Sequence, residues 1–380
     1  MALRLPPGPG FLDALRKAWD RGEAVLPLDP RLPALEIDRL LGEMRPARLL
    51  APREERELSD PLPVEPGVAL VVPTSGSTGL PKGVELTRDS LSASAEASGQ
   101  RLEVFPEDRW LACLPLHHIA GLMVLVRSVL LGRPPVFHAR FDPEAIAVER
   151  EVTMISLVPT MLRRLLDSGV ELSRFRCVLL GGGPAPPTLL ERAAQAGGRV
   201  ITSYGATETC GGVVYDARPL QGVQLRISPE GEILVRGPMV MRGYRGRPDL
   251  TAAALREGWF ATGDAGEVGP DSSLTVLGRR DHMIVTGGEK VSPEEVEAVL
   301  LEHPGVADAA VFGLPDEEWG ERVAAAVVPA PGGPEARGGQ PPAPEPARQA
   351  IPREAGRPSP MRRVTEVGSR SLRERATALP

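Results

Sequence analysis

A run of hydroxyl residues, glycines and one lysine lies behind a short apolar stretch in the first quarter of the chain. Residues 71–83 read VVPTSGSTGLPKG. Glycines let the backbone approach a ligand closely, and successive N–H groups in such a loop form a concavity for anions. Hydroxyls add donors, and Lys82 adds a flexible positive charge. The pattern predicts a polyphosphate-binding loop with these candidate contacts: Thr74, Ser75, Gly76, Ser77, Thr78, Gly79 and Lys82.

This loop differs from the Walker loop of P-loop NTPases. The Walker loop ends in Gly-Lys-Ser/Thr and opens a helix, whereas here Pro81 precedes Lys82 and Gly83 follows it. A flexible glycine–serine linker is the plain alternative. Such linkers do not follow an apolar strand and end in a lysine. We therefore interpret the run as a phosphate-binding loop of a different type.

The ten residues from Thr74 to Gly83 resemble, without a gap, the phosphate-binding motif of the adenylate-forming (AMP-binding) superfamily. This superfamily includes acyl-CoA synthetases, luciferases and peptide-synthetase adenylation domains. The resemblance covers about residues 30–328. Three further motifs follow in the family's order: ITSYGATETCGG at 201–212, GWFATGDAGEV at 258–268 and LGRRDHMIVTGGEK at 277–290. The resemblance implies an acid–thiol ligase that uses ATP, Mg²⁺ and coenzyme A.

The resemblance assigns roles to residues of the second motif. It implies that the ring of Tyr204 lies against adenine, that Thr207 lies near the α-phosphate and that Glu208 binds Mg²⁺. The chemistry agrees, because Mg²⁺ prefers oxygen ligands and needs few carboxylates when it also binds phosphates and water. In the same segment, Gly205 is a candidate nucleotide contact and Ser203 a candidate substrate contact.

The third and fourth motifs supply the remaining family positions. Asp264 matches an aspartate that accepts hydrogen bonds from the ribose hydroxyls, a task that suits an ionised carboxylate. Arg279 matches an arginine that contacts ribose and phosphate. Asp281 matches a hinge about which the C-terminal domain rotates between the two half-reactions.

The segment LPLHHIAGLMVLVRSVLLG at 114–132 narrows the resemblance to the o-succinylbenzoate–CoA ligases of menaquinone biosynthesis. In that family a histidine, matched by His118, opens the helix, and an arginine, matched by Arg127, meets a substrate carboxylate. A guanidinium suits the second carboxylate of a dicarboxylic acid. The residues alone leave two alternatives open: His118 as a core histidine, and Arg127 with its charge extended to the surface.

Strand and helix patterns alternate where these motifs must be positioned. Apolar runs at 152–159 and 177–180 alternate with helical spacing at 160–169 and 188–198, which predicts a largely parallel sheet covered by helices. Candidate nucleotide contacts follow the strand at 177–180, where open α/β sheets bind ligands: they are Gly182 and Gly183. A plain tight turn is the alternative for these glycines.

The predicted fold class is α/β. We expect a large multi-sheet N-terminal adenylation domain at 1–280, with a small β subdomain formed by short strands at 222–245. A small mobile α+β C-terminal domain, incomplete by comparison with the family, is expected at 281–329. Residues 330–380 are rich in Pro, Gly and Arg, and such a segment buries too little apolar surface to order itself.

Composition limits the partners and the compartment. A formal net charge of −6 argues against a nucleic-acid partner, and no apolar run is long enough to span a membrane. The N-terminus shows no signal peptide. Cys113, Cys177 and Cys210 are odd in number and far apart, which suits reduced thiols in the cytoplasm. We expect small-molecule partners, and a homodimer stays open.

One family residue has no match. The adenylate-forming enzymes carry a lysine near the C-terminus that grips the reacting oxygens, yet no lysine follows Lys290 here. We draw two hypotheses: a reading-frame change altered the C-terminus, and adenylation is slowed because a charge that stabilises the transition state is lost.

Two other functions stay open: a ligase for another aryl or fatty acid or for a carrier protein, and a nucleotide-binding remnant.

Overall fold

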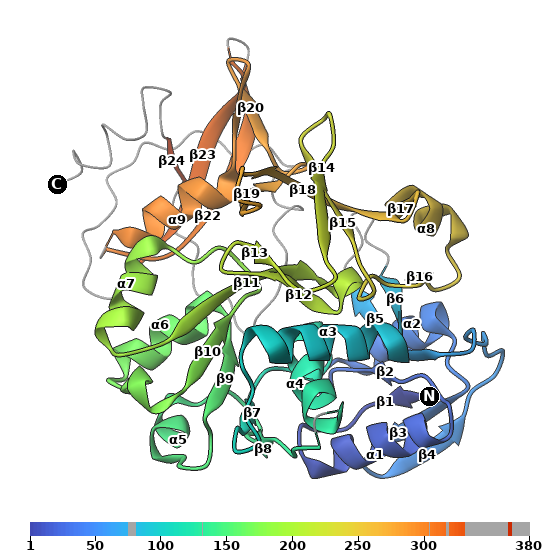
Figure 1. Ribbon diagram of the computed structural model, residues 1–380. Helices are drawn as coiled ribbons and strands as arrows, with labels where there is room; N and C mark the ends of the chain where they lie inside the picture. The colour runs from blue at the N-terminus through green and yellow to red at the C-terminus, as the bar shows by residue number, and fades with distance from the viewer. Residues whose placement is uncertain (75–80, 131, 304, 317–318, 331–363, 367–380) are drawn as a thin grey trace. The chain divides into compact units, whose positions relative to one another are not determined.

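The computed structural model describes residues 1–74, 81–130, 132–303, 305–316, 319–330 and 364–366 (Figure 1). The chain divides into two compact units. The first contains Met1–Thr262 and Gly266–Thr275, and the second contains Gly263–Ala265 and Val276–Pro380. The predicted domain boundaries at 280/281 and 329/330 stay a prediction. Each unit is described below by itself.

The largest sheet in the described part of the first unit has seven strands, in the order β13-β12-β11-β10-β9-β7-β8. Strands β7 to β11 pair in parallel, and β12 and β13 are antiparallel to their neighbours. This arrangement confirms the predicted α/β class. The strands are β7 (Trp110–Ala112), β8 (Val136–Phe137), β9 (Met154–Leu157), β10 (Cys177–Leu180), β11 (Val200–Ala206), β12 (Gly211–Tyr215) and β13 (Arg218–Pro219).

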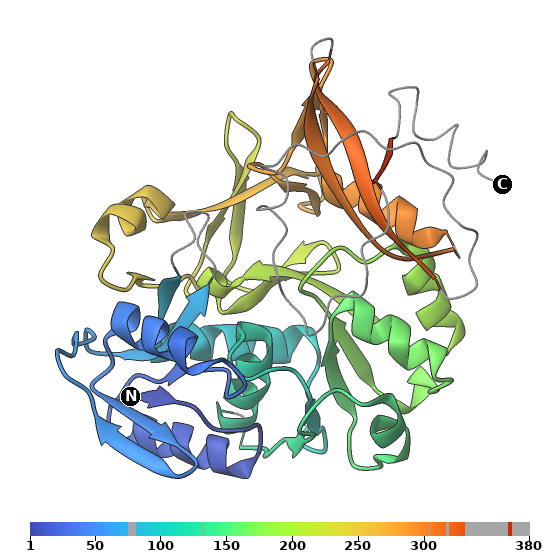
Figure 2. The same ribbon diagram turned by 180° about the vertical axis from the view of Figure 1, so that it is seen from behind.

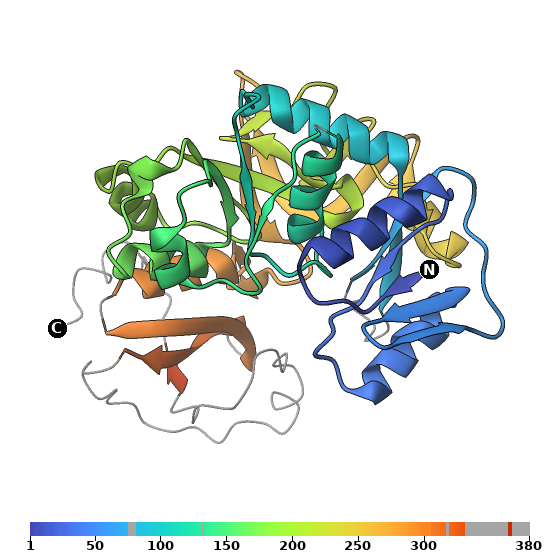
Figure 3. The same ribbon diagram turned by 90° about the horizontal axis from the view of Figure 1, so that it is seen from below.

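Helices pack on both faces of this sheet. Met154 and Cys177 belong to a core with α3 and α4, whereas Ile155 and Val178 belong to a core with α6 and α7. Because both faces are buried, the strands are continuously apolar instead of alternating. α3 and α4 lie next to each other (Figure 3). The helices are α3 (Arg88–Arg101), α4 (Ile119–Leu130), α5 (Pro143–Val148), α6 (Pro159–Asp167) and α7 (Pro187–Gln195).

A three-stranded antiparallel sheet carries the predicted phosphate-binding loop. Its order is β16-β6-β5, with β5 at Val68–Thr74, β6 at Lys82–Thr87 and β16 at Gly243–Tyr244. Residues 75–80, between β5 and β6, lie outside the described residues. β6 leads into α3, whose first turn is capped because the Thr87 hydroxyl accepts a hydrogen bond from the Ser90 N–H.

Two smaller sheets complete the first unit. The N-terminal sheet has the order β2-β1-β3-β4, and the second sheet, the predicted small β subdomain, has the order β14-β15-β18-β17 with β19 beside β18. β18 and β19 continue into the second unit. The elements are β1 (Ala2–Leu3), α1 (Pro9–Asp20), β2 (Leu26–Pro27), α2 (Ala34–Met44), β3 (Arg48–Ala51), β4 (Glu54–Glu57), β14 (Gln224–Ile227), β15 (Glu232–Arg236), α8 (Pro248–Ala254), β17 (Leu255–Arg256), β18 (Trp259–Val268) and β19 (Leu274–Arg279).

The second unit is a small α+β structure. Its sheet has the order β21-β20-β23-β22, and its long strands β22 and β23 lie side by side (Figure 2). Helix α9 packs on β22 around Val296 and Val311. The elements are β20 (Ile284–Thr286), β21 (Glu289–Val291), α9 (Pro293–Glu302), β22 (Val306–Asp316) and β23 (Gly320–Pro329).

A short strand also lies inside the segment predicted to be without structure. β24 (Val364–Glu366) pairs antiparallel with Ala324–Ala326 of β23. The physical reason is that β23 offers an edge whose backbone groups need partners, and a β-prone Val-Thr pair meets that need even in a poorly apolar segment. The prediction was therefore wrong for these three residues.

Candidate active site

Thr74 and Lys82 are held opposite each other at the ends of β5 and β6. They are register partners, and the Thr74 hydroxyl donates to the Lys82 carbonyl oxygen at 3.4 Å. The five central residues of the predicted loop lie outside the described residues, so their roles stay a prediction: Ser75, Gly76, Ser77, Thr78 and Gly79. The pairing of Thr74 with Lys82 fixes the position of the lysine at the start of β6.

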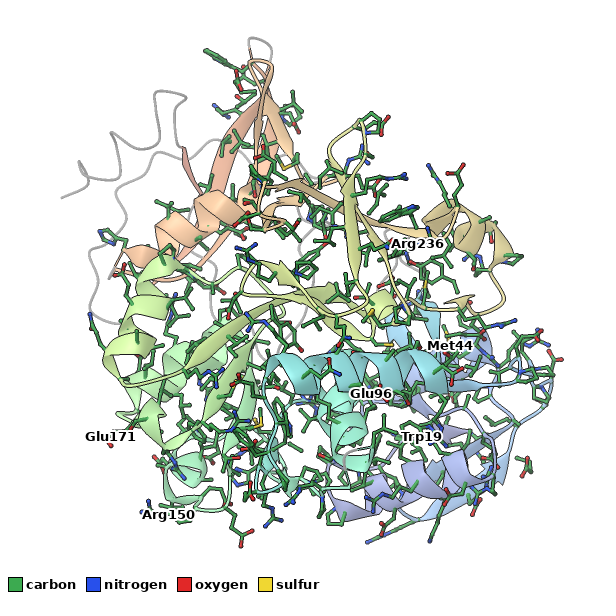
Figure 4. All side chains as sticks on the ribbon, viewed as in Figure 1. Trp19, Met44, Glu96, Arg150, Glu171 and Arg236 are labelled. Atoms are coloured by element: carbon green, nitrogen blue, oxygen red, sulfur yellow. The ribbon has the colours of Figure 1, made fainter. Side chains whose placement is uncertain are left out.

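The glycine after this lysine has a packing reason. A Cβ atom at Gly83 would lie 2.5 Å from the sulfur of Met44, which is labelled in Figure 4, and 3.0 Å from Val71. The first contact is shorter than real Cβ contacts, and the second is tighter than most of them. Gly83 therefore lets the end of α2 pack directly against β6, next to Lys82.

Lys82 and Glu208, from the first two motifs, both contact Tyr244. The Lys82 Nζ lies 4.8 Å from the centroid of the Tyr244 ring, and the Tyr244 hydroxyl donates to Glu208 Oε1 at 2.8 Å. β16 brings Tyr244 there because it pairs with β6 opposite Val84. The sequence analysis missed Tyr244. The only sequence feature that points to it is that it is an aromatic residue in a two-residue strand, Gly243–Tyr244.

Glu208 lies in a 3₁₀ turn at Thr207–Thr209, directly after β11. The Met241 N–H donates to its carbonyl oxygen at 2.7 Å, which fixes the backbone. Among the described residues no lysine, arginine or histidine forms an ion pair with its carboxylate, so the negative charge is not neutralised. This donor set fits Mg²⁺, which takes one carboxylate and completes its shell with phosphate and water oxygens. The described residues hold no cluster of three or more metal-ligating side chains.

The carboxyl ends of β10 and β11 bring several predicted contacts to one sheet edge. A Cβ atom at Gly181 would lie 3.2 Å from the Ser203 carbonyl oxygen. Gly182, which follows, adopts φ +80°, a conformation that favours glycine. Gly205 faces the opposite strand so closely that a Cβ atom there would lie 2.0 Å from the Gly211 carbonyl oxygen. Gly183 and Tyr204 lie beside these positions in the chain.

His118 lies at the start of α4 and is exposed, so the alternative of a core histidine is wrong for it. Its ring lies 4.2 Å from that of His117, whose Nε2 is 3.7 Å from Asp29 Oδ2. Burial and the neighbouring His118 lower the pKa of His117 to about 4, so that ring is neutral at pH 7. The helix begins at Ile119, directly after His118.

Arg127 is buried, with 3% of its surface exposed, so the alternative of a surface-extended charge is wrong. Its guanidinium lies 5.1 Å from the Trp110 ring centroid, and Nη2 donates to the Tyr215 hydroxyl at 3.4 Å. Its Nε has no hydrogen-bond partner. Among the described residues no carboxylate forms an ion pair with Arg127. A buried charge without a counter-ion raises the free energy of the folded state.

Tyr215 links this arginine to the sheet edge. It pairs with Ser203 across β11 and β12, and its hydroxyl lies 3.0 Å from Ser98 Oγ. A Cβ atom at Gly212 would lie 2.2 Å from Ser203 Oγ and 2.5 Å from the Tyr215 ring. Tyr215, which the sequence analysis missed, thus lies next to both predicted substrate contacts, Ser203 and Arg127.

In the second unit three predicted residues form one cluster. Arg279 Nη1 lies 3.2 Å from Asp264 Oδ1, and its Nε lies 3.2 Å from Asp281 Oδ1. Burial alone would raise the pKa of the Asp281 carboxyl, but the hydrogen bond and charge of Arg279 outweigh it, so this pKa lies below its usual value. Gly263, at φ +77°, leaves room for the arginine, since a Cβ atom would lie 2.8 Å from Nη2.

The cysteines offer no nucleophile. All three are buried and outside any disulfide. Burial raises their thiol pKa values, to about 12 for Cys113, about 11 for Cys177 and about 12 for Cys210, so the reactive thiolate is not populated at pH 7. No helix in the described part of the chain is long and apolar enough to cross a bilayer.

The family described as AMP-binding enzyme matches residues 46–245, and the AMP-binding enzyme C-terminal domain matches residues 295–369. The second match extends the resemblance beyond its predicted end near residue 328. The physical reason is that β24, far along the chain, still belongs to the sheet of the second unit.

Curated relatives carry a common name. The chain is 45% identical over 316 residues to a probable 2-succinylbenzoate–CoA ligase of Mycobacterium tuberculosis, covering 78% of this chain and 81% of that protein. It is 44% identical over 285 residues to a 2-succinylbenzoate–CoA ligase of Bacillus pumilus, covering 68% of this chain. This chain spans 59% of the length of the Bacillus pumilus protein.

Solved structures agree in fold. The o-succinylbenzoate CoA synthetase of Bacillus subtilis, in complex with the acyl-adenylate OSB-AMP, superposes with a TM-score of 0.79 at 34% identity, covering 87% of this chain and 78% of that one. The same enzyme with ATP and a magnesium ion gives a TM-score of 0.77 at 33% identity, covering 86% and 78%. With a family match over more than half of its length, the chain belongs to the AMP-binding enzymes.

Proposed function

We propose that this chain is an ATP-dependent acid–CoA ligase whose acid is 2-succinylbenzoate. The observation that carries the proposal is that Lys82 and Glu208 contact one tyrosine side chain, Lys82 at its ring and Glu208 at its hydroxyl, which puts the end of the phosphate loop near a carboxylate without an ion-pair partner among the described residues. A lysine suits phosphate oxygens, and a lone carboxylate suits Mg²⁺ bound to those oxygens. The names of the relatives support the same reading.

In the first half-reaction the acid carboxylate attacks the α-phosphorus of ATP. A carboxylate O–P bond forms, the bond to the β-phosphate oxygen breaks, and pyrophosphate leaves with the electron pair. Lys82 binds the phosphate chain, Thr207 lies by the α-phosphate, and Glu208 holds the metal. Bound Mg²⁺ supplies charge neutralisation on the leaving group. No side-chain nucleophile is required, so positioning carries the catalysis.

Arg127 supports a dicarboxylic acid. Its guanidinium is buried and has no acidic partner among the described residues. A substrate with a second carboxylate would supply that partner through charge-assisted hydrogen bonds, with His118 and Ser203 as neighbouring contacts. A fatty acid has only the carboxylate that reacts, so it would leave the guanidinium unpaired. A site that binds a polar group of its substrate discriminates against acids without that group.

In the second half-reaction the CoA thiol attacks the acyl carbon, forms the thioester and releases AMP. Asp264 is proposed to accept the ribose hydroxyls, Arg279 to contact ribose and phosphate, and Asp281 to be the hinge. We place the reaction in the cytoplasm, where three buried thiols stay reduced. A homodimer stays a prediction.

The test is a panel of acids with two readouts. Acid-dependent ATP–pyrophosphate exchange and CoA-thioester formation are measured with 2-succinylbenzoate, benzoate and octanoate. We expect both signals with 2-succinylbenzoate and background with the other two acids. Equal rates with octanoate would overturn the choice of acid. Nucleotide binding with no exchange for any acid would instead identify a nucleotide-binding remnant.

A further inference from the structure

Tyr244 lies between two residues of opposite charge and contacts both. Its hydroxyl donates to Glu208 Oε1 at 2.8 Å, and its ring faces the Lys82 Nζ at 4.8 Å from the centroid. The side chain is 8% exposed. A phenol holds a carboxylate through a neutral donor, so the carboxylate keeps its charge. The negative face of the ring attracts the ammonium.

The backbone around Tyr244 is fixed from several sides. Its N–H donates to Thr251 Oγ1 at 2.9 Å, and it pairs with Val84 of β6. Arg245, the next residue, donates to the carbonyl oxygens of Met44 at 2.5 Å and of Leu62. These contacts fix the backbone that carries the tyrosine, which a positioning residue needs.

Glu208 and Lys82 do not form an ion pair with each other, although both contact the side chain of Tyr244. If they paired, the carboxylate would no longer be available to bind the metal, and the ammonium would no longer be available to bind the phosphates. The ring separates the two charges and gives each of them an alternative contact. A spacer of this kind keeps a cation and an anion available side by side for a ligand that carries both signs, a metal–triphosphate complex.

We propose that Tyr244 is a positioning residue that orients the Glu208 carboxylate for Mg²⁺ and keeps the Lys82 ammonium apart from it. The inference rests on the proposed function, because it assumes that the metal–nucleotide complex binds here. It assigns the hydroxyl and the ring separate tasks. The hydroxyl acts on the metal ligand, and the ring acts on the lysine.

The first test is Tyr244→Phe, which removes the hydroxyl and keeps the ring. ATP binding is measured by calorimetry across a series of Mg²⁺ concentrations and again in EDTA. We expect the half-saturating Mg²⁺ concentration to rise about tenfold, as for a lost hydrogen bond to a charged group. ATP affinity in EDTA should not change. A role in packing alone would weaken ATP binding equally in both conditions and would overturn the proposal.

Two further variants make the test specific. Tyr215→Phe is the matched control, because it removes another buried phenol hydroxyl that contacts Arg127 and not Glu208; its Mg²⁺ dependence should equal that of the wild type. In a Glu208→Gln background, Tyr244→Phe should cause no further rise, since the hydroxyl acts through that carboxylate. Additive effects of the two substitutions would contradict the proposal.

The failure of this inference differs from the failure of the proposed function. A wild-type chain without Mg²⁺-dependent ATP binding would overturn the function, whereas normal binding with an unchanged Tyr244→Phe variant would overturn the role of Tyr244 alone. Should Tyr244→Phe fail to fold, 4-fluorophenylalanine at position 244 fills nearly the same space and also lacks the donor hydroxyl. An Mg²⁺ requirement equal to that of the wild type would then count against the proposal.

Discussion

Single side chains decide which charges are available to a ligand. In the first unit a carboxylate, an ammonium and a guanidinium are each held by an aromatic residue: Glu208 and Lys82 by Tyr244, and Arg127 by Trp110 and Tyr215. An aromatic neighbour attracts a cation or donates a hydrogen bond and cancels no charge. The charged groups therefore stay able to bind phosphate, metal and carboxylate.

Replacing Lys82 by alanine tests the phosphate contact. We expect the dissociation constant of ATP to rise about tenfold, since a charge-assisted contact is lost. Lys17→Ala is the matched control, because Lys17 is exposed on α1 and should leave ATP binding unchanged. Calorimetric titration measures both. Equal affinity of the Lys82 variant and the wild type would remove the phosphate-loop assignment.

Replacing Arg127 by methionine separates substrate binding from stability. We expect kcat/KM for 2-succinylbenzoate to fall about 100-fold, because a buried charge contact in the complex is lost. The midpoint of thermal unfolding should stay or rise, since an apolar side chain replaces a buried unpaired charge. Steady-state kinetics and thermal melts check both. A lower melting midpoint with normal kinetics would show that Arg127 serves the fold instead.

Elements bring together residues that the sequence holds far apart. The sequence predicted the strand–helix alternation, the α/β class and the small β subdomain because hydrophobic spacing is local. It did not predict Tyr244, Tyr215 or Gly212, because their importance depends on which strands pair: β16 with β6, and β12 with β11. The roles of individual site residues stay predictions for the same reason, and the centre of the phosphate loop lies outside the described residues.

Asp108 ties the starts of three strands of the large sheet together. It accepts hydrogen bonds from Arg176 Nε and from Thr153 Oγ1, both at 2.8 Å, and from the Phe105 N–H at 2.7 Å. Burial alone would raise its pKa, but Arg176 and the other donors lower the pKa below its usual value. A depressed carboxyl pKa stabilises the fold above its unfolded-state pKa, and this stabilisation is lost as pH falls through the folded-state pKa.

Asp108→Asn should therefore lower the free energy of unfolding by about 2 kcal/mol at pH 7, because the partly buried Arg176 guanidinium loses its charged hydrogen-bond partner. The difference from the wild type should shrink as pH falls below about 4, where the unfolded chain takes up the proton first, and it should be lost below the depressed pKa of the folded Asp108 carboxyl. Chemical unfolding at a series of pH values checks this. A difference that stays constant down to pH 2 would argue against the ionic contribution.

At the scale of the whole molecule the chain consists of two units, and the proposed reaction needs both. The first unit carries the candidate phosphate, metal and acid contacts. The second carries the cluster of Arg279 with Asp264 and Asp281. Asp281 is itself a member of this cluster, and a change in its backbone angles would reorient the chain that follows it.

Asp281→Pro tests the hinge, because proline fixes φ near −65°. We expect acid-dependent pyrophosphate exchange to persist and CoA-thioester formation to fall by about tenfold or more. Asp281→Asn, which keeps the backbone free, is the control and should slow neither step by as much. Single-turnover measurements separate the two half-reactions. Parallel loss of both steps in the proline variant would speak against a hinge.

The buried cysteines have a practical consequence for studying such movements. Because burial keeps all three native thiols protonated and inaccessible, maleimide dyes should not label them under native conditions. A cysteine introduced at exposed Glu96 in the first unit and another at half-exposed Val299 in the second could then carry a fluorophore pair in the otherwise unaltered chain. Energy transfer between the dyes would follow the catalytic cycle in real time.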